Sequence, residues 1–239
     1  MPVDRRARRA PASLAPVGFR AVLLDWRGTL AVTLSEEQWV ERALARLGRV
    51  PSYDGVAAVV AAVRAADGAG TDGAGGRLDA PGVDADADLH RRTYREVLAA
   101  AGLDEELCEA LYAVESDPTN DVFADDVEGT LRELRRRGVR TAVVSDVHVD
   151  VRPVFAAAGL LGLVDTFTLS FEVGAQKPDP AVFRRTLDAL GVAPDEALMV
   201  GDRSRPDGGA VDVGITTLLL PPLRGRGDRR LHRVLALCA

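Results

Sequence analysis

The chain has few cysteines, few aromatic residues and almost no lysine. The small number of cysteines and the lack of a long apolar run each exclude a class of protein. The two cysteines, Cys108 and Cys238, are too few for a disulfide framework and lack a metal-ligand spacing, so reduced thiols in the cytoplasm are expected. No run of about 18 apolar residues occurs, so the sequence predicts no membrane span. Lys177 is the one lysine among 30 basic residues.

The chain also lacks an excess of positive charge. Its net charge is −6 at pH 7, whereas a nucleic-acid-binding domain needs a basic face to neutralise phosphates. Arginines cluster near both ends, at Arg5, Arg6, Arg8, Arg9, Arg224, Arg226, Arg229 and Arg230. We interpret the first group as part of a solvated tail and the second as a solvated face. Neither a nucleic-acid nor a membrane partner is expected, and the sequence does not determine the oligomeric state.

The chain does contain a repeated alternation of strand and helix patterns. Short apolar runs occur at residues 20–25, 139–145, 196–201 and 215–220. Unbroken runs of this length are typical of strands covered on both faces, as in parallel sheets. Between them, Asp125 with Glu128 and Asp179 with Pro180 resemble helix-capping signals. The alternation predicts an α/β fold with a Rossmann-like three-layer parallel-sheet core.

A helical region interrupts this alternation after the first strand. Ser35 and Gln38 predict a helix start, and further helical patterns follow at residues 53–66, 86–101 and 104–115. We therefore predict an N-terminal tail, a core in two segments and an inserted α-helical domain, at residues 1–17, 18–32 with 120–239, and 33–119 respectively.

A segment rich in Gly, Ala and Asp, residues 67–88, lies inside the helical insertion and predicts a loop. Its aspartates at 84, 86 and 88 resemble the start of a calcium loop, but the glycine and the closing glutamate of such a loop are missing. We interpret this segment as a solvated linker.

Four polar features fall where predicted strands or turns end, and in open parallel sheets the ligand site lies there. They are Asp25 before the Gly28-Thr29 turn, Ser145, Lys177 before a helix start, and Asp202 with Asp207. A carboxylate at a strand tip can attack an electrophile, and paired carboxylates suit a hard cation. Each feature alone is also consistent with a cap or a turn; their order on successive strand ends favours a catalytic site.

Lys177 adds an independent argument. Where nearly every basic position is arginine, a single lysine indicates a site that needs a compact ammonium group rather than a planar guanidinium. An accident of composition is the alternative.

These four segments together are similar to the four motifs of the haloacid dehalogenase-like (HAD) superfamily, over about residues 18–30 and 120–220. The helical insertion stands where that family carries its cap domain. The resemblance implies that Asp25 is the nucleophile and that Mg²⁺ is held by Asp25, Asp202 and the backbone carbonyl of Arg27. It implies that Asp207 supports the metal or orients Lys177. It also implies substrate-binding positions at Trp26, Thr29, Ser145, Asp146 and Lys177.

Arg27 departs from the phosphatase pattern of this family, which carries a second Asp there as general acid and base. A guanidinium is a poor proton shuttle near neutral pH, so the mechanism cannot be copied intact. A substrate with a good leaving group, a replacement acid such as His148, or binding of a phosphorylated ligand without turnover would each account for it. Dehalogenase chemistry also needs no acid, whereas phosphonatase chemistry needs a cap lysine that this chain lacks.

We therefore predict a magnesium-dependent phosphatase or phosphotransferase that acts on a small phosphorylated metabolite through Asp25, with Arg27 and Lys177 also at the catalytic centre. The alternatives are a catalytically impaired ligand-binding protein and a haloacid dehalogenase-type hydrolase. Substrate choice is expected in the cap, where the candidates are Trp39, Tyr53, His90, Arg91, Arg92 and Tyr94.

Overall fold

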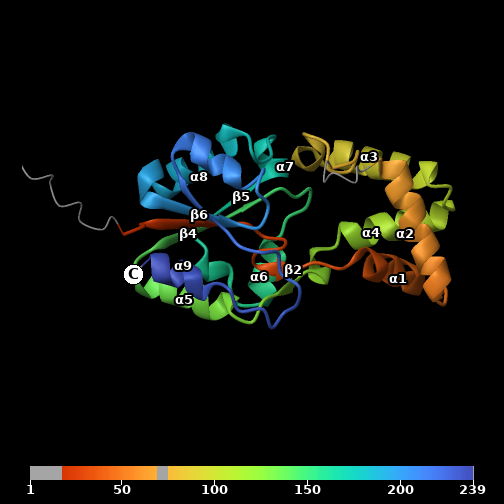
Figure 1. The fold of residues 1–239 in the computed structure, drawn as a ribbon, viewed down its shortest axis with the longest axis horizontal. Helices are drawn as coiled ribbons and strands as arrows, with labels where there is room; N and C mark the ends of the chain where they lie inside the picture. Colours follow the sequence, from red (N-terminus) through yellow and green to blue (C-terminus); the bar gives the residue numbers. More distant parts are fainter. Residues whose placement is uncertain (1–17, 69–74, 239) are drawn as a thin grey trace, which may run out of the picture.

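A five-stranded parallel sheet forms the centre of the molecule (Figure 1). The computed structural model describes residues 18–68 and 75–238, and the predicted tail at 1–17 lies outside them. In spatial order the strands are β5 (Thr166–Leu169), β4 (Arg140–Ser145), β1 (Ala21–Leu24), β6 (Ala197–Gly201) and β7 (Thr216–Leu219). The four predicted strands are confirmed. β5 was not predicted, because its sequence TFTL forms no continuous apolar run and its alternation of polar and apolar residues lasts only four residues.

Helices cover both faces of this sheet. Val22 and Leu24 of β1 pack into one core cluster, and Ala21 and Leu23 pack into the other, because successive side chains of a strand point to opposite faces. The covering helices are α5 (Val127–Arg136), α6 (Arg152–Ala157), α7 (Ser170–Val173), α8 (Pro180–Leu190) and α9 (His232–Leu237). Short 3-10 turns connect them at η3 (Leu161–Leu163), η4 (Pro194–Glu196) and η5 (Gly208–Val213). The predicted Rossmann-like α/β core is confirmed.

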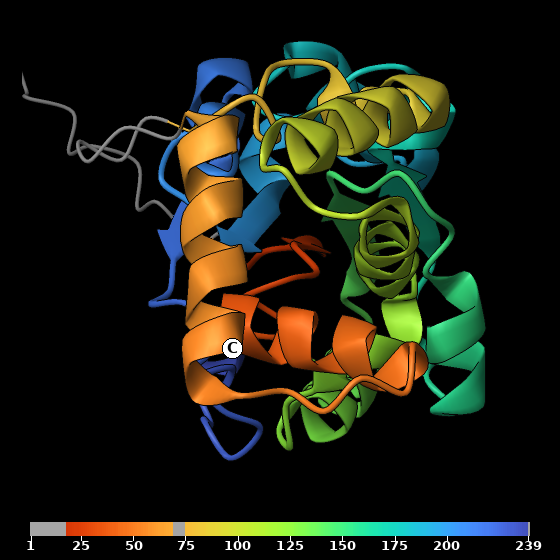
Figure 2. The same ribbon diagram turned by 90° about the vertical axis from the view of Figure 1, so that its right-hand side faces the viewer.

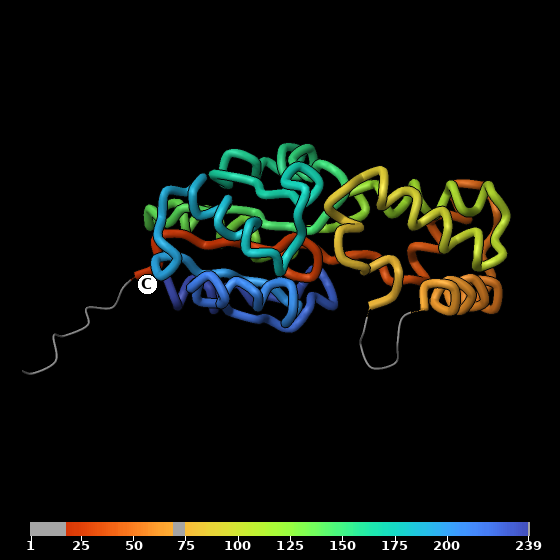
Figure 3. Tube along the Cα trace, turned by 90° about the horizontal axis from the view of Figure 1, so that it is seen from above, coloured from red at the N-terminus to blue at the C-terminus, as the bar shows by residue number. Residues whose placement is uncertain are grey.

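The helical insertion lies beyond one end of the sheet (Figures 1 and 3). Figure 2, viewed from that end, shows its helices in front of the core. Its elements are α1 (Glu36–Arg46), α2 (Tyr53–Asp67), η1 (Val83–Ala85), α3 (Ala87–Ala100), α4 (Glu105–Glu115) and η2 (Pro118–Asn120). Ser35 and Gln38 form the expected capping box of α1. The insertion has its own apolar cluster, separate from the two clusters on the sheet.

Two short antiparallel strands, β2 (Ala31–Val32) and β3 (Val122–Phe123), join the insertion to the core. Their pairing brings the outgoing and returning chain segments side by side, so both connections leave the core at one place. Among the described residues, no helix is long and apolar enough to cross a bilayer.

Two sequence-based interpretations of charged residues were wrong. Asp125 does not cap α5, because the cap residue is Asp126, without a side-chain cap bond, and Asp125 accepts a hydrogen bond from Arg226 at 2.6 Å. Arg230 is not solvated: it is 8% exposed and donates to the backbone carbonyls of Gly28 and Thr29 at 3.1 and 2.9 Å. The C-terminal segment therefore supports the turn that follows β1.

Candidate active site

The predicted catalytic residues meet at the carboxyl ends of the three central strands. Asp25 directly follows β1, Ser145 ends β4, and Asp202 directly follows β6. All three line a pocket of about 410 Å³ between the core and the insertion. The insertion contributes Leu78, Asp79, Asp84, Tyr94 and Glu115 to its wall. The sheet topology thus gathers residues that are more than 170 positions apart in the sequence.

Lys177 lies between two carboxylates and is fully buried. Its Nζ donates to Asp25 Oδ1 and to Asp207 Oδ1, each at 2.6 Å. Burial alone lowers the pKa of Lys177, but the charges of Asp25, Asp146 and Asp207 outweigh burial and raise it. Burial also raises the pKa of Asp25 to about 7, against the opposing charge of Lys177. The ammonium group therefore stays charged and orients the Asp25 carboxylate.

The acidic residues at this edge fit a magnesium ion. Carboxylate oxygens of Asp25, Asp202 and Asp207 lie within 4.8 Å of one another, and Mg²⁺ prefers such ligands. Gly28, at φ +79°, lets the turn pass so close that a Cβ would lie 2.5 Å from Asp202 Oδ2. Gly201 gives Asp207 similar room, since a Cβ there would lie 2.1 Å from Asp207 Oδ2. At both positions, a residue larger than glycine would clash with a carboxylate of the site.

The three carboxylates differ in how many of their oxygens accept a hydrogen bond from the protein. Both oxygens of Asp207 already accept hydrogen bonds, from Lys177 Nζ and from the Arg203 backbone N–H. Asp25 Oδ2 and Asp202 Oδ2 accept no hydrogen bond from the described part of the chain. Of the two roles that the family resemblance implied for Asp207, orienting Lys177 therefore agrees better with its contacts. Direct ligation fits Asp25 and Asp202.

Arg27 is held by acidic residues at the exit from the insertion. Its Nη1 lies 2.6 Å from Glu115 Oε1, and its Nε lies 3.0 Å from Asp121 Oδ2. A further bond joins Nη2 to the carbonyl of Glu115 at 3.2 Å. Burial lowers the pKa of Arg27, but the Glu115 and Asp121 carboxylates raise it overall. The side chain is thus a permanently charged link between core and insertion and not a proton shuttle.

Three predicted substrate-binding side chains have other contacts. Trp26 is 0% exposed, packs against Phe123 and Phe155, and is absent from the pocket wall, so only its backbone is suited to ligand binding. Thr29 is buried and donates to Asp202 Oδ1 at 3.2 Å. The Asp146 carboxylate accepts from the Lys177 backbone and from Arg203, and its negative charge disfavours direct contact with phosphate.

The predicted cap residues separate into interior and surface positions. Tyr94 lines the pocket, and His90 stacks on it with ring centroids 4.3 Å apart. Trp39 packs inside the insertion and donates to the Leu111 carbonyl. Tyr53 is 89% exposed, and Arg91 and Arg92 also lie on the surface. Of these six residues, Tyr94 is the one in the pocket wall.

Several residues of the pocket wall were not predicted from the sequence, and Arg203 and Asp84 are two of them. Arg203 follows Asp202 directly and lines the pocket, with Nη2 3.2 Å from Asp146 Oδ2; its place beside the fourth motif was a usable signal. Asp84 lies in the segment interpreted as a solvated linker, yet it lines the pocket, and burial raises its pKa to about 7. The Gly- and Asp-rich composition around it gave no such signal.

Comparison with known proteins agrees with this geometry. The family model described as haloacid dehalogenase-like hydrolase matches residues 19–210. A phosphoserine phosphatase from Thermus thermophilus is 36% identical over 140 residues, which cover 55% of each protein. A glyceraldehyde 3-phosphate phosphatase from Methanopyrus kandleri is 36% identical over 95 residues, which cover 39% of this chain and 41% of that protein.

A crystal structure of a HAD phosphatase from Thermococcus onnurineus superimposes with a TM-score of 0.55 at 26% identity, covering 88% of this chain and 89% of that one. The chain therefore belongs to the haloacid dehalogenase-like hydrolases. The matched region spans about half the length, or less, of the two curated relatives, so it identifies the family rather than a particular substrate.

Proposed function

We propose that the protein is a magnesium-dependent phosphatase that acts on a small phosphorylated metabolite with Asp25 as nucleophile. The observation that carries this proposal is the pairing of Asp25, which lines the pocket, with the buried Lys177 behind it, beside the free oxygen of Asp202. The phosphatase names of the relatives support it. The size of the pocket, about 410 Å³, suits a metabolite rather than a protein segment.

In this mechanism, each side chain has one task. The Asp25 carboxylate, held by Lys177, attacks phosphorus while the P–O bond to the leaving group breaks, which gives an aspartyl-phosphate and the free leaving group. Water then cleaves the aspartyl-phosphate, so that the Asp25 carboxylate is regenerated and both protons of the water leave with the inorganic phosphate. Lys177 and the Ser145 hydroxyl bind oxygens of the transferring group. Asp25 and Asp202 would hold Mg²⁺, together with the Arg27 carbonyl that the family resemblance implies. The ion supplies positive charge that offsets the charge on the phosphoryl oxygens.

Arg27 limits the substrates that this site turns over efficiently. The pattern of the family places the proton donor for the leaving group at this position, and here that position holds a guanidinium bound to Glu115 and Asp121. A leaving group that departs without protonation, such as the carboxylate of an acyl phosphate, needs no donor. We therefore propose activated phosphates, acyl or aryl, as better substrates than simple alkyl esters.

The test is phosphate release, with and without Mg²⁺, from acetyl phosphate, p-nitrophenyl phosphate, sugar phosphates and nucleotides. We expect magnesium-dependent release that falls as the leaving group becomes more basic and that Asp25→Asn abolishes. Glu37→Gln, an exposed change outside the pocket, is the matched control and should leave the rate unchanged. Magnesium-independent release, or full activity of Asp25→Asn, would contradict the proposal.

The two alternatives make different predictions. A dehalogenase would release halide from 2-haloacids without magnesium, and a ligand-binding protein would be stabilised by phosphorylated compounds without turnover. Halide release and ligand-dependent melting temperature, measured on the same preparation, separate these outcomes from phosphatase activity.

A further inference from the structure

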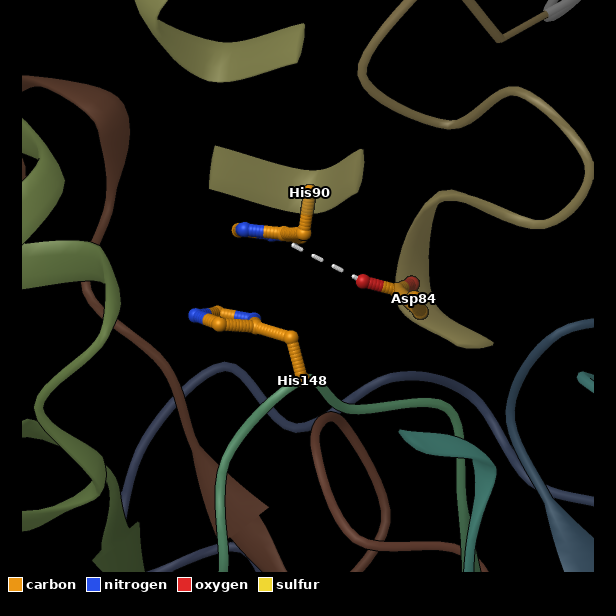
Figure 4. Close-up of side chains that lie close together, drawn as sticks. All are labelled: Asp84, His90 and His148. Carbon is orange, nitrogen blue, oxygen red and sulfur yellow. Dashed lines mark ion pairs between the residues drawn. The ribbon is translucent and has the colours of Figure 1, made fainter. Parts of the chain in front are cut away.

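A second cluster of potential ligands lies where the insertion meets the core (Figure 4). His90 comes from α3, Asp84 from η1, and His148 from the loop after β4. One ligand atom of each residue lies within 4.8 Å of those of the other two. Asp84 and His148 line the active-site pocket, and the cluster shares no residue with the Asp25, Asp202 and Asp207 set.

The imidazole of His90 lacks a hydrogen-bond partner although it is buried. The residue is 1% exposed, and its Nδ1 has no partner within the described ranges 18–68 and 75–238. Its Nε2 lies 3.7 Å from Asp84 Oδ1, which is too far for a hydrogen bond. An unpartnered buried polar group is costly, so such a group in a native structure requires an explanation. An ion bound at Nδ1 supplies one.

One ring nitrogen of His148 is hydrogen-bonded, and the other, Nδ1, is available to bind an ion. Its Nε2 is 2.9 Å from the hydroxyl of Ser116, which leaves Nδ1 for a ligand. Metal-binding histidines commonly use one nitrogen for the ion and the other for such an outer contact.

We propose that Asp84, His90 and His148 form a second metal site, for a borderline divalent ion such as Zn²⁺ or Co²⁺. Two imidazoles and one carboxylate match the preferences of these ions, whereas Mg²⁺ prefers oxygen ligands alone. Because two ligands come from the insertion and one from the core, a bound ion ties the two parts together at the wall of the pocket.

Ion binding requires a rearrangement of the two rings. They are stacked with centroids 3.3 Å apart and planes 13° apart, so their in-plane lone pairs lie in two nearly parallel planes and do not converge on one ion. Coordination therefore turns at least one ring out of the stack, toward Asp84. Loss of this stack is a spectroscopic signature of binding, observable as shifts of the two histidine resonances in NMR spectra.

The test is a titration of the full chain with Co²⁺, monitored by optical absorption. Excess Mg²⁺ is present throughout to occupy the site formed by Asp25, Asp202 and Asp207. We expect one equivalent of Co²⁺ in a site with nitrogen ligands, displaced by Zn²⁺. His90→Ala and His148→Ala should each weaken binding about tenfold or more. The third histidine, His232, lies on the surface of α9, so His232→Ala is the matched control and should bind as the wild type does.

Asp84→Asn, which keeps the shape of the side chain, provides a second variant if a histidine substitution impairs folding, and it should also weaken binding. Absence of the Co²⁺ bands in the wild type, or equal affinity of the His90, His148 and His232 variants, would overturn the proposal. The measurement needs no substrate, and Asp25→Asn should still bind Co²⁺. Its outcome is therefore independent of the phosphatase assay.

Discussion

At the scale of single residues, Lys177 shows why this chain keeps one lysine. Its ammonium group donates to two carboxylates, Asp25 and Asp207, at 2.6 Å each inside a fully buried site. A compact charge with rotatable donors satisfies both acceptors, whereas a planar guanidinium presents its donors in a fixed fork. The single lysine of the chain thus occupies a site that suits a compact ammonium group.

Replacing Lys177 should impair both catalysis and stability. Lys177→Arg is expected to reduce phosphate release by about 10²-fold or more, because charge at the phosphoryl group is displaced. Lys177→Met should cost about 3–5 kcal/mol of unfolding free energy, because two buried carboxylates lose their counter-ion. Urea unfolding and steady-state kinetics measure these effects, with the exposed Arg184→Met on α8 as control.

The double variant Lys177→Met, Asp207→Asn should recover part of the lost unfolding free energy. If the losses of the two single variants simply added, the pairing of Lys177 with Asp207 would be contradicted.

Arg27→Asp is predicted to fail as a simple restoration of the missing acid. The new carboxylate would lie beside Glu115 and Asp121, which now lose their shared cation. We expect a loss of about 1–3 kcal/mol and little gain in rate. The triple variant Arg27→Asp, Glu115→Gln, Asp121→Asn removes that repulsion and should hydrolyse alkyl phosphates faster than Arg27→Met. Equal rates would show that position 27 does not limit turnover.

At the scale of elements, long apolar runs and strong capping signals were predictable, and mixed patterns were not. β1, β4, β6 and β7 follow from Val- and Leu-rich runs, and α8 begins with the expected Asp179 cap and Pro180. β5 is only four residues long and forms no apolar run, so its pairing with β4 identifies it as a strand. Asp125 and Arg230 were misassigned because their partners are about 100 or more residues away.

Arg230 gives a prediction at this scale, because it holds the turn after β1 from the C-terminal segment. Arg230→Met removes the donors to the Gly28 and Thr29 carbonyls, so we expect that more Mg²⁺ is needed for half-maximal activity and that stability falls by about 1–3 kcal/mol. Arg229→Met, an exposed neighbour, is the matched control. An unchanged magnesium dependence in Arg230→Met would show that the turn is fixed without it.

At the scale of the whole molecule, the pocket depends on the insertion lying against the core. The Ser170 hydroxyl donates to the Asp84 carbonyl at 2.6 Å, and the Gly82 N–H donates to Gln176 Oε1 at 2.7 Å. The stack of His90 on His148 completes this contact. The core half of the site was predictable, because its residues follow strands. In the insertion, Tyr94 was among the predicted candidates, whereas Asp84 was not, because nothing in residues 67–88 indicates which side chains turn inward.

The contact between insertion and core should be sensitive to pH. The pKa of His90 and His148 is lowered to about 3 and 4 by burial, against about 6.5 in an unfolded chain. The unfolded state therefore binds more protons below about pH 6.5, and each histidine weakens folding by about 1.4 kcal/mol per pH unit from there down to about pH 4.

Asp25 and Asp84, whose pKa values burial raises to about 7, act in the opposite direction over the same range and mask this effect in the total. The informative quantity is thus the difference in unfolding free energy between wild type and His148→Asn at pH 7, 6 and 5. That difference should shift in favour of the variant as the pH falls. A difference independent of pH would mean that His148 titrates normally in the folded protein.

The central claim is that Asp25 carries the phosphoryl group during turnover. Rapid acid quench of the wild type with acetyl phosphate and Mg²⁺, followed by mass spectrometry of the peptide that contains Asp25, tests it most directly. We expect a peptide heavier by one phosphoryl group, absent without Mg²⁺ and absent in Asp25→Asn. Steady phosphate release without any modified peptide, and with Asp25→Asn still active, would contradict it.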